Sequence, residues 1–251
     1  MKGICKLCKE EKELIKRSHI FPNFMYKGIG DDKNRINVIS SLEPYKNKLV
    51  QNGAYEEFIL CCECESLLSR HERYANNYLY SQPYITNNDD FEQLTNFDGI
   101  NLIRCKNINY TQFKLFLQSL IWRASISSHK LFDNFKLSEQ QEEQLRNSLI
   151  KSIKLNVEDY ACLIFTHQDI EDAETDLVFI RPNINTISFF INQFIYLFYL
   201  DKAEVDDTVC EMSLNYKNEM GIIKLPNIEW TKMRKSIFDD AALLAMKHLK
   251  T

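Results

Sequence analysis

The sequence lacks several patterns that identify common enzyme classes. With only 6 glycines and 5 prolines in 251 residues, it has no glycine-rich phosphate loop and no G-x-S-x-G nucleophile elbow. Internal repeats and low-complexity tracts are also missing. These absences argue against a P-loop nucleotide-binding site, an α/β-hydrolase serine site and a repeat architecture.

A long hydrophobic run is missing as well. The longest apolar stretch covers 14 residues, 187–200, and contains Asn192 and Gln193, so it is too short and too polar to span a bilayer. No positively charged segment followed by an apolar run opens the chain, so no secretory signal is predicted. We therefore expect a cytoplasmic protein without a membrane partner. In that reducing compartment, the 8 cysteines favour metal binding over disulfides.

The chain also lacks an overall excess of positive charge. Its net charge is −4, which disfavours a general nucleic-acid binder. The distribution is uneven, however, because residues 1–50 hold 11 Lys and Arg against 6 Asp and Glu. That segment carries +5 and the remaining residues carry −9, so contact with DNA or another nucleic acid is expected to be confined to the N-terminal part.

Two C-x-x-C pairs are the most informative feature that is present. Cys5 and Cys8 form the first pair, and Cys61 and Cys64 the second. Four thiolates are the ligand set that a tetrahedral structural Zn²⁺ prefers, and about 50 residues separate the pairs, so the metal would close a long loop. Cys62 is left out because a one-residue spacer rarely lets both sulfurs face one ion. The alternative is four reduced, buried cysteines without a metal.

The segment between the pairs suggests a family. A C-x-x-C pair, then Ser18–Pro22 (SHIFP), then L-C-x-x-C followed by a helical pattern resembles the HNH endonucleases. The resemblance covers about residues 1 to 76. It implies a treble-clef (ββα-metal) zinc module and a metal-dependent nuclease, and by analogy with the family's habits a role in bacterial defence.

The resemblance also implies catalytic residues. His19 matches the family's general base, which takes a proton from the water that attacks a phosphodiester. Glu65, directly after the second pair, stands where the family commonly has a metal-binding histidine. A carboxylate binds Mg²⁺ or Mn²⁺, so Glu65 would hold the catalytic cation, together with Glu72 two helical turns further along.

The chain departs from the family at several positions. Ser18 stands where the family usually has Asp or His as a ligand of the catalytic cation, and serine is a weak ligand. The central Asn of the family would fall near Glu56 or Glu57, where no Asn is present. Ser69 replaces a further histidine of some members. His19 therefore has two interpretations, as a base or as a structural histidine that steadies the loop or ligates zinc.

The rest of the chain predicts an α+β body of unknown function. We expect a zinc module over residues 1–80 and a second domain over 81–251. The patterns predict central helices over 110–127 and 138–153, then a small antiparallel sheet over 158–225, and a closing helix over 229–250. Ser138–Gln141 is a capping box that opens the second helix, and Asn192-Gln193 is expected to form a hairpin turn within the sheet. Trp122-Arg123, within the first of these helices, is interpreted as core.

Three functions follow from these observations. The first is an HNH-like nuclease with structural zinc, a catalytic Mg²⁺ or Mn²⁺ and the residues His19 and Glu65. The second is an inactive zinc-stabilised module that binds nucleic acid or a protein partner. In the third, zinc only stabilises a domain whose function lies in the sheet.

Overall fold

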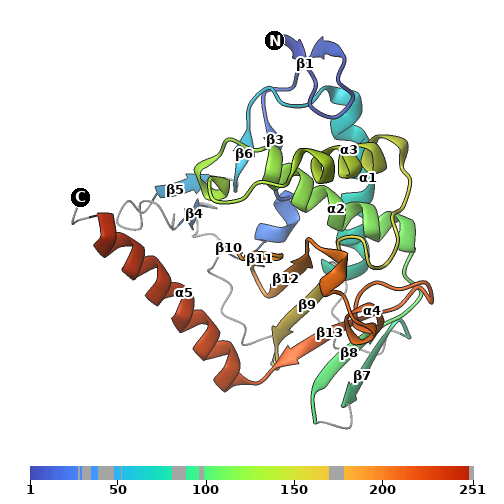
Figure 1. The fold of residues 1–251 in the computed structure, drawn as a ribbon, viewed down its shortest axis with the longest axis vertical. Helices are drawn as coiled ribbons and strands as arrows, with labels where there is room; N and C mark the ends of the chain where they lie inside the picture. The colour runs from blue at the N-terminus through green and yellow to red at the C-terminus, as the bar shows by residue number, and fades with distance from the viewer. Residues whose placement is uncertain are drawn as a thin grey trace.

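The computed structural model is a mixed α+β fold (Figure 1). Within the described residues it contains five α-helices, one seven-stranded mixed sheet and three two-stranded sheets. No helix in this part of the chain combines the length and the hydrophobicity that crossing a bilayer requires. The described residues are 1–27, 29, 35–38, 48–51, 53–80, 89–95, 99–169 and 178–248.

The N-terminal part consists of short strands and one helix. Strand β1 (Lys2–Ile4) pairs antiparallel with β2 (Glu11–Glu13), and β3 (Ser18–His19) pairs antiparallel with β6 (Tyr55–Glu56). Helix α1 (Cys62–Ala75) follows β6 after a short connection. The remaining elements of this part are the antiparallel strands β4 (Arg35–Val38) and β5 (Lys48–Gln51), the 3₁₀ turn Asn23–Tyr26 and the π-helical turn Asn76–Tyr80.

Helix α2 (Tyr110–Ile126) is the central helix of the core. Its side chains are buried almost all round, and both α1 and α3 pack against it. The Asn109 side chain caps its start by accepting a hydrogen bond from the Gln112 N–H. Helix α3 (Glu139–Lys151) begins with the predicted capping box, in which Ser138 and Gln141 bond each other's backbone N–H. A helix buried on all sides is typical of a protein interior.

The large sheet contains a parallel pair at its centre. Strands β9 and β13 run parallel, and every other neighbouring pair of described strands is antiparallel. The strands, in spatial order, are β10 (Val178–Pro182), β11 (Thr186–Ile191), β12 (Phe194–Tyr199), β9 (Cys162–His167), β13 (Met220–Leu225), β8 (Asn101–Cys105) and β7 (Phe91–Thr95).

This arrangement corrects the predicted small antiparallel sheet over residues 158–225. The sheet is larger, because β7 and β8 join it from before α2, and it is mixed. The physical reason is the position of β13, which lies between β8 and β9 and hydrogen-bonds to both. The predicted turn at Asn192-Gln193 is confirmed, since it joins β11 to β12 with Asn192 at φ 58°.

A second, smaller core lies on part of the sheet. Phe179, Phe190 and Ile195 pack there with Trp230 from the start of α5. The bounds of α5 are Asn227–His248, the short helix α4 spans Asp207–Met212, and the 3₁₀ turns span Lys130–Phe132 and Lys202–Glu204.

The main core joins the N-terminal part to the sheet. The Phe21 ring, just after β3, lies 5.4 Å from the Phe132 ring and 5.0 Å from the Phe189 ring of β11, measured between centroids. The Asn192 side chain donates to the Lys27 carbonyl at 2.7 Å. The segment after His19 is therefore packed on the sheet. The predicted domain boundary lies between residues 80 and 81, and residues 81–88 are outside the described residues.

Candidate metal centre and adjoining charge cluster

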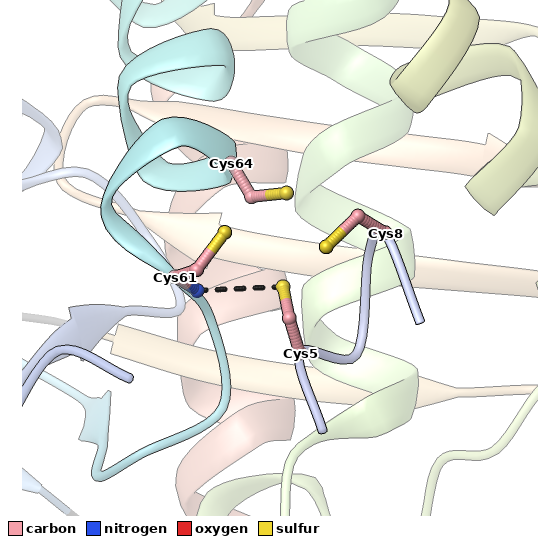
Figure 2. A group of neighbouring side chains, drawn as sticks. All are labelled: Cys5, Cys8, Cys61 and Cys64. Carbon is pink, nitrogen blue, oxygen red and sulfur yellow. Dashed lines mark hydrogen bonds between the residues drawn. The ribbon is translucent and has the colours of Figure 1, made fainter. Parts of the chain in front are cut away.

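Four cysteines meet beside the start of α1. The Sγ atoms of Cys5, Cys8, Cys61 and Cys64 all lie within 4.8 Å of one another. In Figure 2 the four sulfurs point toward a common centre from α1 and from the N-terminal turn. Zn–S bonds of about 2.3 Å in a tetrahedron place sulfurs roughly 3.8 Å apart. The four cysteines could therefore hold a metal ion such as zinc with a small contraction.

Local backbone geometry brings the two pairs together. Cys5 and Cys8 lie in the turn between β1 and β2, which Lys9 closes at φ 63°. Cys61 is the N-cap of α1, and its N–H donates to Cys5 Sγ at 3.3 Å (Figure 2). The Lys6 N–H donates to the carbonyl of Ile59. Hydrogen bonds from backbone N–H groups stabilise sulfur as thiolate, the form that binds a metal.

The protonation of these thiols depends on burial. Burial raises the pKa of Cys61 to about 11 and that of Cys64 further. Burial also acts to raise the pKa of Cys5, but the backbone N–H groups of Cys8 and Cys61 outweigh it and lower that pKa. Several buried thiolates in one place need a cation to balance their charge. The donor set therefore fits a structural dication.

The other cysteines lie apart from this group. Cys62 is exposed, although it neighbours Cys61. Cys105 and Cys162 are buried in strands β8 and β9, and Cys210 is half-buried in α4. None of the eight cysteines forms a disulfide.

The histidine-bearing strand lies against the same helix. Ser18 of β3 is buried and donates its hydroxyl hydrogen to Glu65 Oε2 of α1 at 2.8 Å. His19 is half-buried and stands opposite Tyr55 in the β3–β6 pair. The structure thus brings the Ser18 side chain into contact with Glu65, and His19 is the next residue of β3.

Arg123 of α2 completes a charge cluster with these residues. Its guanidinium is fully buried, and Nη1 lies 2.6 Å from Glu72 Oε1 and donates to the His19 carbonyl at 2.8 Å. The contact with Glu72 is an ion pair, and Glu72 Oε1 accepts no hydrogen bond from the described residues. Nη2 lies 3.9 Å from Glu65 Oε2. The helix of the body therefore supplies a cation to the N-terminal part.

Burial and Arg123 set the charge states of the neighbouring groups. Burial lowers the pKa of His19, and the positive charge of Arg123 lowers it further. Its imidazole is therefore neutral near pH 7, the form that accepts a proton. Burial raises the pKa of Glu65, and Arg123 opposes that effect.

The described part of the chain has no group of residues that matches the ligand set of the predicted catalytic Mg²⁺ or Mn²⁺. Mg²⁺ and Mn²⁺ prefer octahedral oxygen ligands. Glu65 and Glu72 both face Arg123, and Ser18 directs its hydrogen to Glu65. Among the described residues, the four cysteines are the group with three or more converging metal-ligating atoms.

Glu56 ties strand β6 to the end of α2. Its carboxylate accepts hydrogen bonds from Ser127 Oγ at 2.5 Å, from the Ser128 N–H at 3.0 Å and from the Ser128 hydroxyl. Burial alone would raise the pKa of Glu56, but these hydrogen bonds hold it below its ordinary value. The two-stranded sheet that carries His19 is thus fixed from both of its strands.

This contact predicts an acid-sensitive step in stability. A carboxylate whose pKa is lowered by folding stabilises the protein above the unfolded pKa of about 4.3, and the effect is lost as pH falls through the folded value. We expect Glu56→Gln to lower the free energy of unfolding by about 1–2 kcal/mol at pH 7. Urea unfolding should show the difference shrinking between pH 5 and pH 3. Glu57→Gln, at an exposed neighbour, is the control, and an equal loss in both variants would contradict the assignment.

Sequence reasoning missed the role of Arg123. Trp122 and Arg123 are both buried, as their interpretation as core predicts, but the guanidinium also reaches β3. A charged residue inside an otherwise apolar helix is the signal that could have found it, because a buried charge needs a partner. His71, a buried histidine of α1, hydrogen-bonds Gln112 of α2 at 2.6 Å and serves packing.

No protein-family model, no curated protein and no solved structure matches this chain.

Proposed function

We propose that the chain is an HNH-like, zinc-stabilised nuclease that hydrolyses phosphodiester bonds. One observation supports it most: the half-buried His19 lies in a two-stranded sheet beside the helix that the second cysteine pair opens, and its neighbour Ser18 hydrogen-bonds Glu65. These are the positions to which the family resemblance assigns catalysis.

The proposal includes a treble-clef frame around structural zinc. The order of elements supports it, since a cysteine turn between β1 and β2 is followed by the β3–β6 pair and then by α1 with Cys61 and Cys64 at its start. Zinc would hold these elements together and take no part in the reaction. Metal binding in such modules is coupled to folding.

His19 acts as the general base in this mechanism. Its neutral imidazole takes a proton from a water molecule as the water oxygen forms a bond to phosphorus. The phosphorus–oxygen bond to the leaving 3′ oxygen then breaks, and that oxygen takes a proton from solvent. Two hydrogen bonds hold β3 in place. Arg123 donates to the His19 carbonyl, and Ser18 donates to Glu65.

Nucleic acid is the partner that the surface beside His19 suits. The Arg17 guanidinium carbon lies 4.9 Å from the centroid of the Tyr55 ring, and Tyr55 is the cross-strand neighbour of His19. Arg17 is exposed. A cation held over an aromatic ring is pre-organised to contact a phosphate that lies next to the general base His19.

A single substitution tests the nuclease. We expect His19→Ala to reduce nicking of a supercoiled plasmid at least 100-fold, the usual contribution of a general base, while zinc content and the circular dichroism spectrum stay unchanged. His248→Ala, at the last described residue of α5, is the matched control. Nicking by the His19 variant at the wild-type rate would remove His19 from the mechanism.

The second candidate is a non-catalytic module that binds nucleic acid or a protein partner. The ion pair of Arg123 with Glu72 favours it, because that carboxylate is already neutralised by a residue of the protein. In this case the wild type should retain labelled DNA or RNA in a gel-shift assay and cleave neither, whether Mg²⁺, Mn²⁺ or no divalent ion is added.

A further inference from the structure

The cluster behind His19 contains one cation that belongs to the protein. Arg123 has no exposed surface, and arginine stays protonated in proteins. Its guanidinium is close to Glu72, to Glu65 and to the His19 carbonyl. A buried guanidinium is stable only where negative or carbonyl oxygens surround it. The two glutamates of α1 therefore serve as its counter-ions.

A divalent ion in the same place conflicts with this arrangement. Glu65 and Glu72 lie seven residues apart on one side of α1, and Arg123 contacts both. An ion held by these two carboxylates would lie within a few ångströms of the guanidinium, where like charges repel strongly at low dielectric. Glu65 Oε2 also accepts the hydroxyl hydrogen of Ser18, so this carboxylate oxygen already has a partner within the protein.

We propose that Arg123 is the resident cation of this site and takes the place of a catalytic Mg²⁺ or Mn²⁺. The inference rests on the proposed nuclease function and changes its metal requirement. Arg123 is a positioning residue: it binds the backbone of His19 and both glutamates, and its Nε and Nη2 have no hydrogen-bond partner among the described residues. The active site is thus completed by α2 of the body, and nicking does not depend on added divalent ions.

Manganese binding tests the inference without relying on activity. The full-length protein, loaded with one equivalent of zinc, is titrated with Mn²⁺ up to about 1 mM, and the electron paramagnetic resonance signal of free Mn²⁺ is followed. The wild type is expected to leave that signal as it is in buffer. Arg123→Met frees Glu65 and Glu72, so this variant should take up one equivalent. Two results would overturn the inference. One is Mn²⁺ binding by the wild type that is lost in Glu65→Gln. The other is an Arg123→Met variant that folds but binds no Mn²⁺.

A conservative variant covers the case in which Arg123→Met does not fold. Arg123→Lys keeps the positive charge but loses the planar donor fork. It should still exclude Mn²⁺, while plasmid nicking falls about 100-fold because His19 is no longer held in position. Mn²⁺ uptake by Arg123→Lys would count against the inference.

Nicking assays separate the two proposals. If the zinc-loaded wild type nicks the plasmid at the same rate with and without added Mg²⁺, the result supports both the nuclease and the inference about Arg123. Nicking that requires Mg²⁺ overturns the inference and leaves the nuclease. No nicking under any condition overturns the nuclease, and Mn²⁺ exclusion then still decides whether Arg123 is the resident cation.

Discussion

If the four cysteines hold zinc as proposed, a Cys64→Ser variant is expected to bind no zinc and to lose the folded structure of its N-terminal part. Strands β1 and β2 have three residues each, and β3 and β6 have two each, so their hydrogen bonds alone cannot hold them. Structural zinc contributes about 10–16 kcal/mol of apparent binding free energy in small zinc domains. Losing one ligand should remove most of it. Zinc analysis by mass spectrometry and hydrogen exchange at residues 2–19 measure the effect.

Cys62→Ser is the matched control for this experiment. Cys62 neighbours Cys61 in sequence but is exposed, and it is not in the group of converging sulfurs. Its replacement should leave zinc content and exchange rates unchanged. If Cys62→Ser released zinc, or if Cys64→Ser retained a full equivalent and its slow exchange, the ligand set would have to be reassigned.

The cysteine cluster was predictable because its chemistry is local. Each C-x-x-C spacing places two sulfurs on one turn, and few alternatives satisfy four soft ligands in one chain. The choice of Cys61 over Cys62 also follows from local geometry, since Cys61 is the N-cap of α1 and Cys62 points to solvent. The neighbourhood of Ser18 and Glu65 came from the family resemblance, which covers only the N-terminal part.

The ion pair of Arg123 was not predictable in this way. Its partners lie 51 and 58 residues away, at Glu72 and Glu65. They meet only because α2 packs against α1 and directs that guanidinium toward β3. Periodicity places Arg123 on a buried face, but it cannot say which carboxylate neutralises a buried charge.

The sheet was predictable only where its contacts are local. The β11–β12 hairpin follows from two apolar runs joined at Asn192-Gln193. The parallel pairing of β9 and β13 links residues far apart in the chain, and β8 joins β13 across the whole of α2 and α3. Strand patterns do not encode such long-range partners. The sequence therefore predicts strands more reliably than it predicts the sheet.

Lys114→Met is expected to stabilise the protein at neutral pH. Lys114 of α2 is only 2% exposed, and its Nζ donates to the Val157 carbonyl at 3.2 Å. Burial lowers the pKa of Lys114 to about 8, and the nearby Cys162 and Asp159 offset this only in part. A lysine whose pKa falls on folding destabilises the folded state wherever it is charged. Lowering the pKa from 10.5 to about 8 corresponds to roughly 3 kcal/mol.

The pH dependence distinguishes this effect from better packing. Below pH 8 the folded protein holds a buried ammonium group, so the gain from methionine should be largest, about 2–3 kcal/mol at pH 7. As pH rises from 8 toward 10.5, the folded wild type releases the proton and the gain should shrink. Urea unfolding at pH 7 and pH 9.5 measures both values. Lys154→Met removes an exposed ammonium that lies 5.0 Å from the Tyr110 ring centroid, and it should change stability by less than about 1 kcal/mol. A gain at Lys114 that is equal at the two pH values would mean that burial of its charge is not the cause.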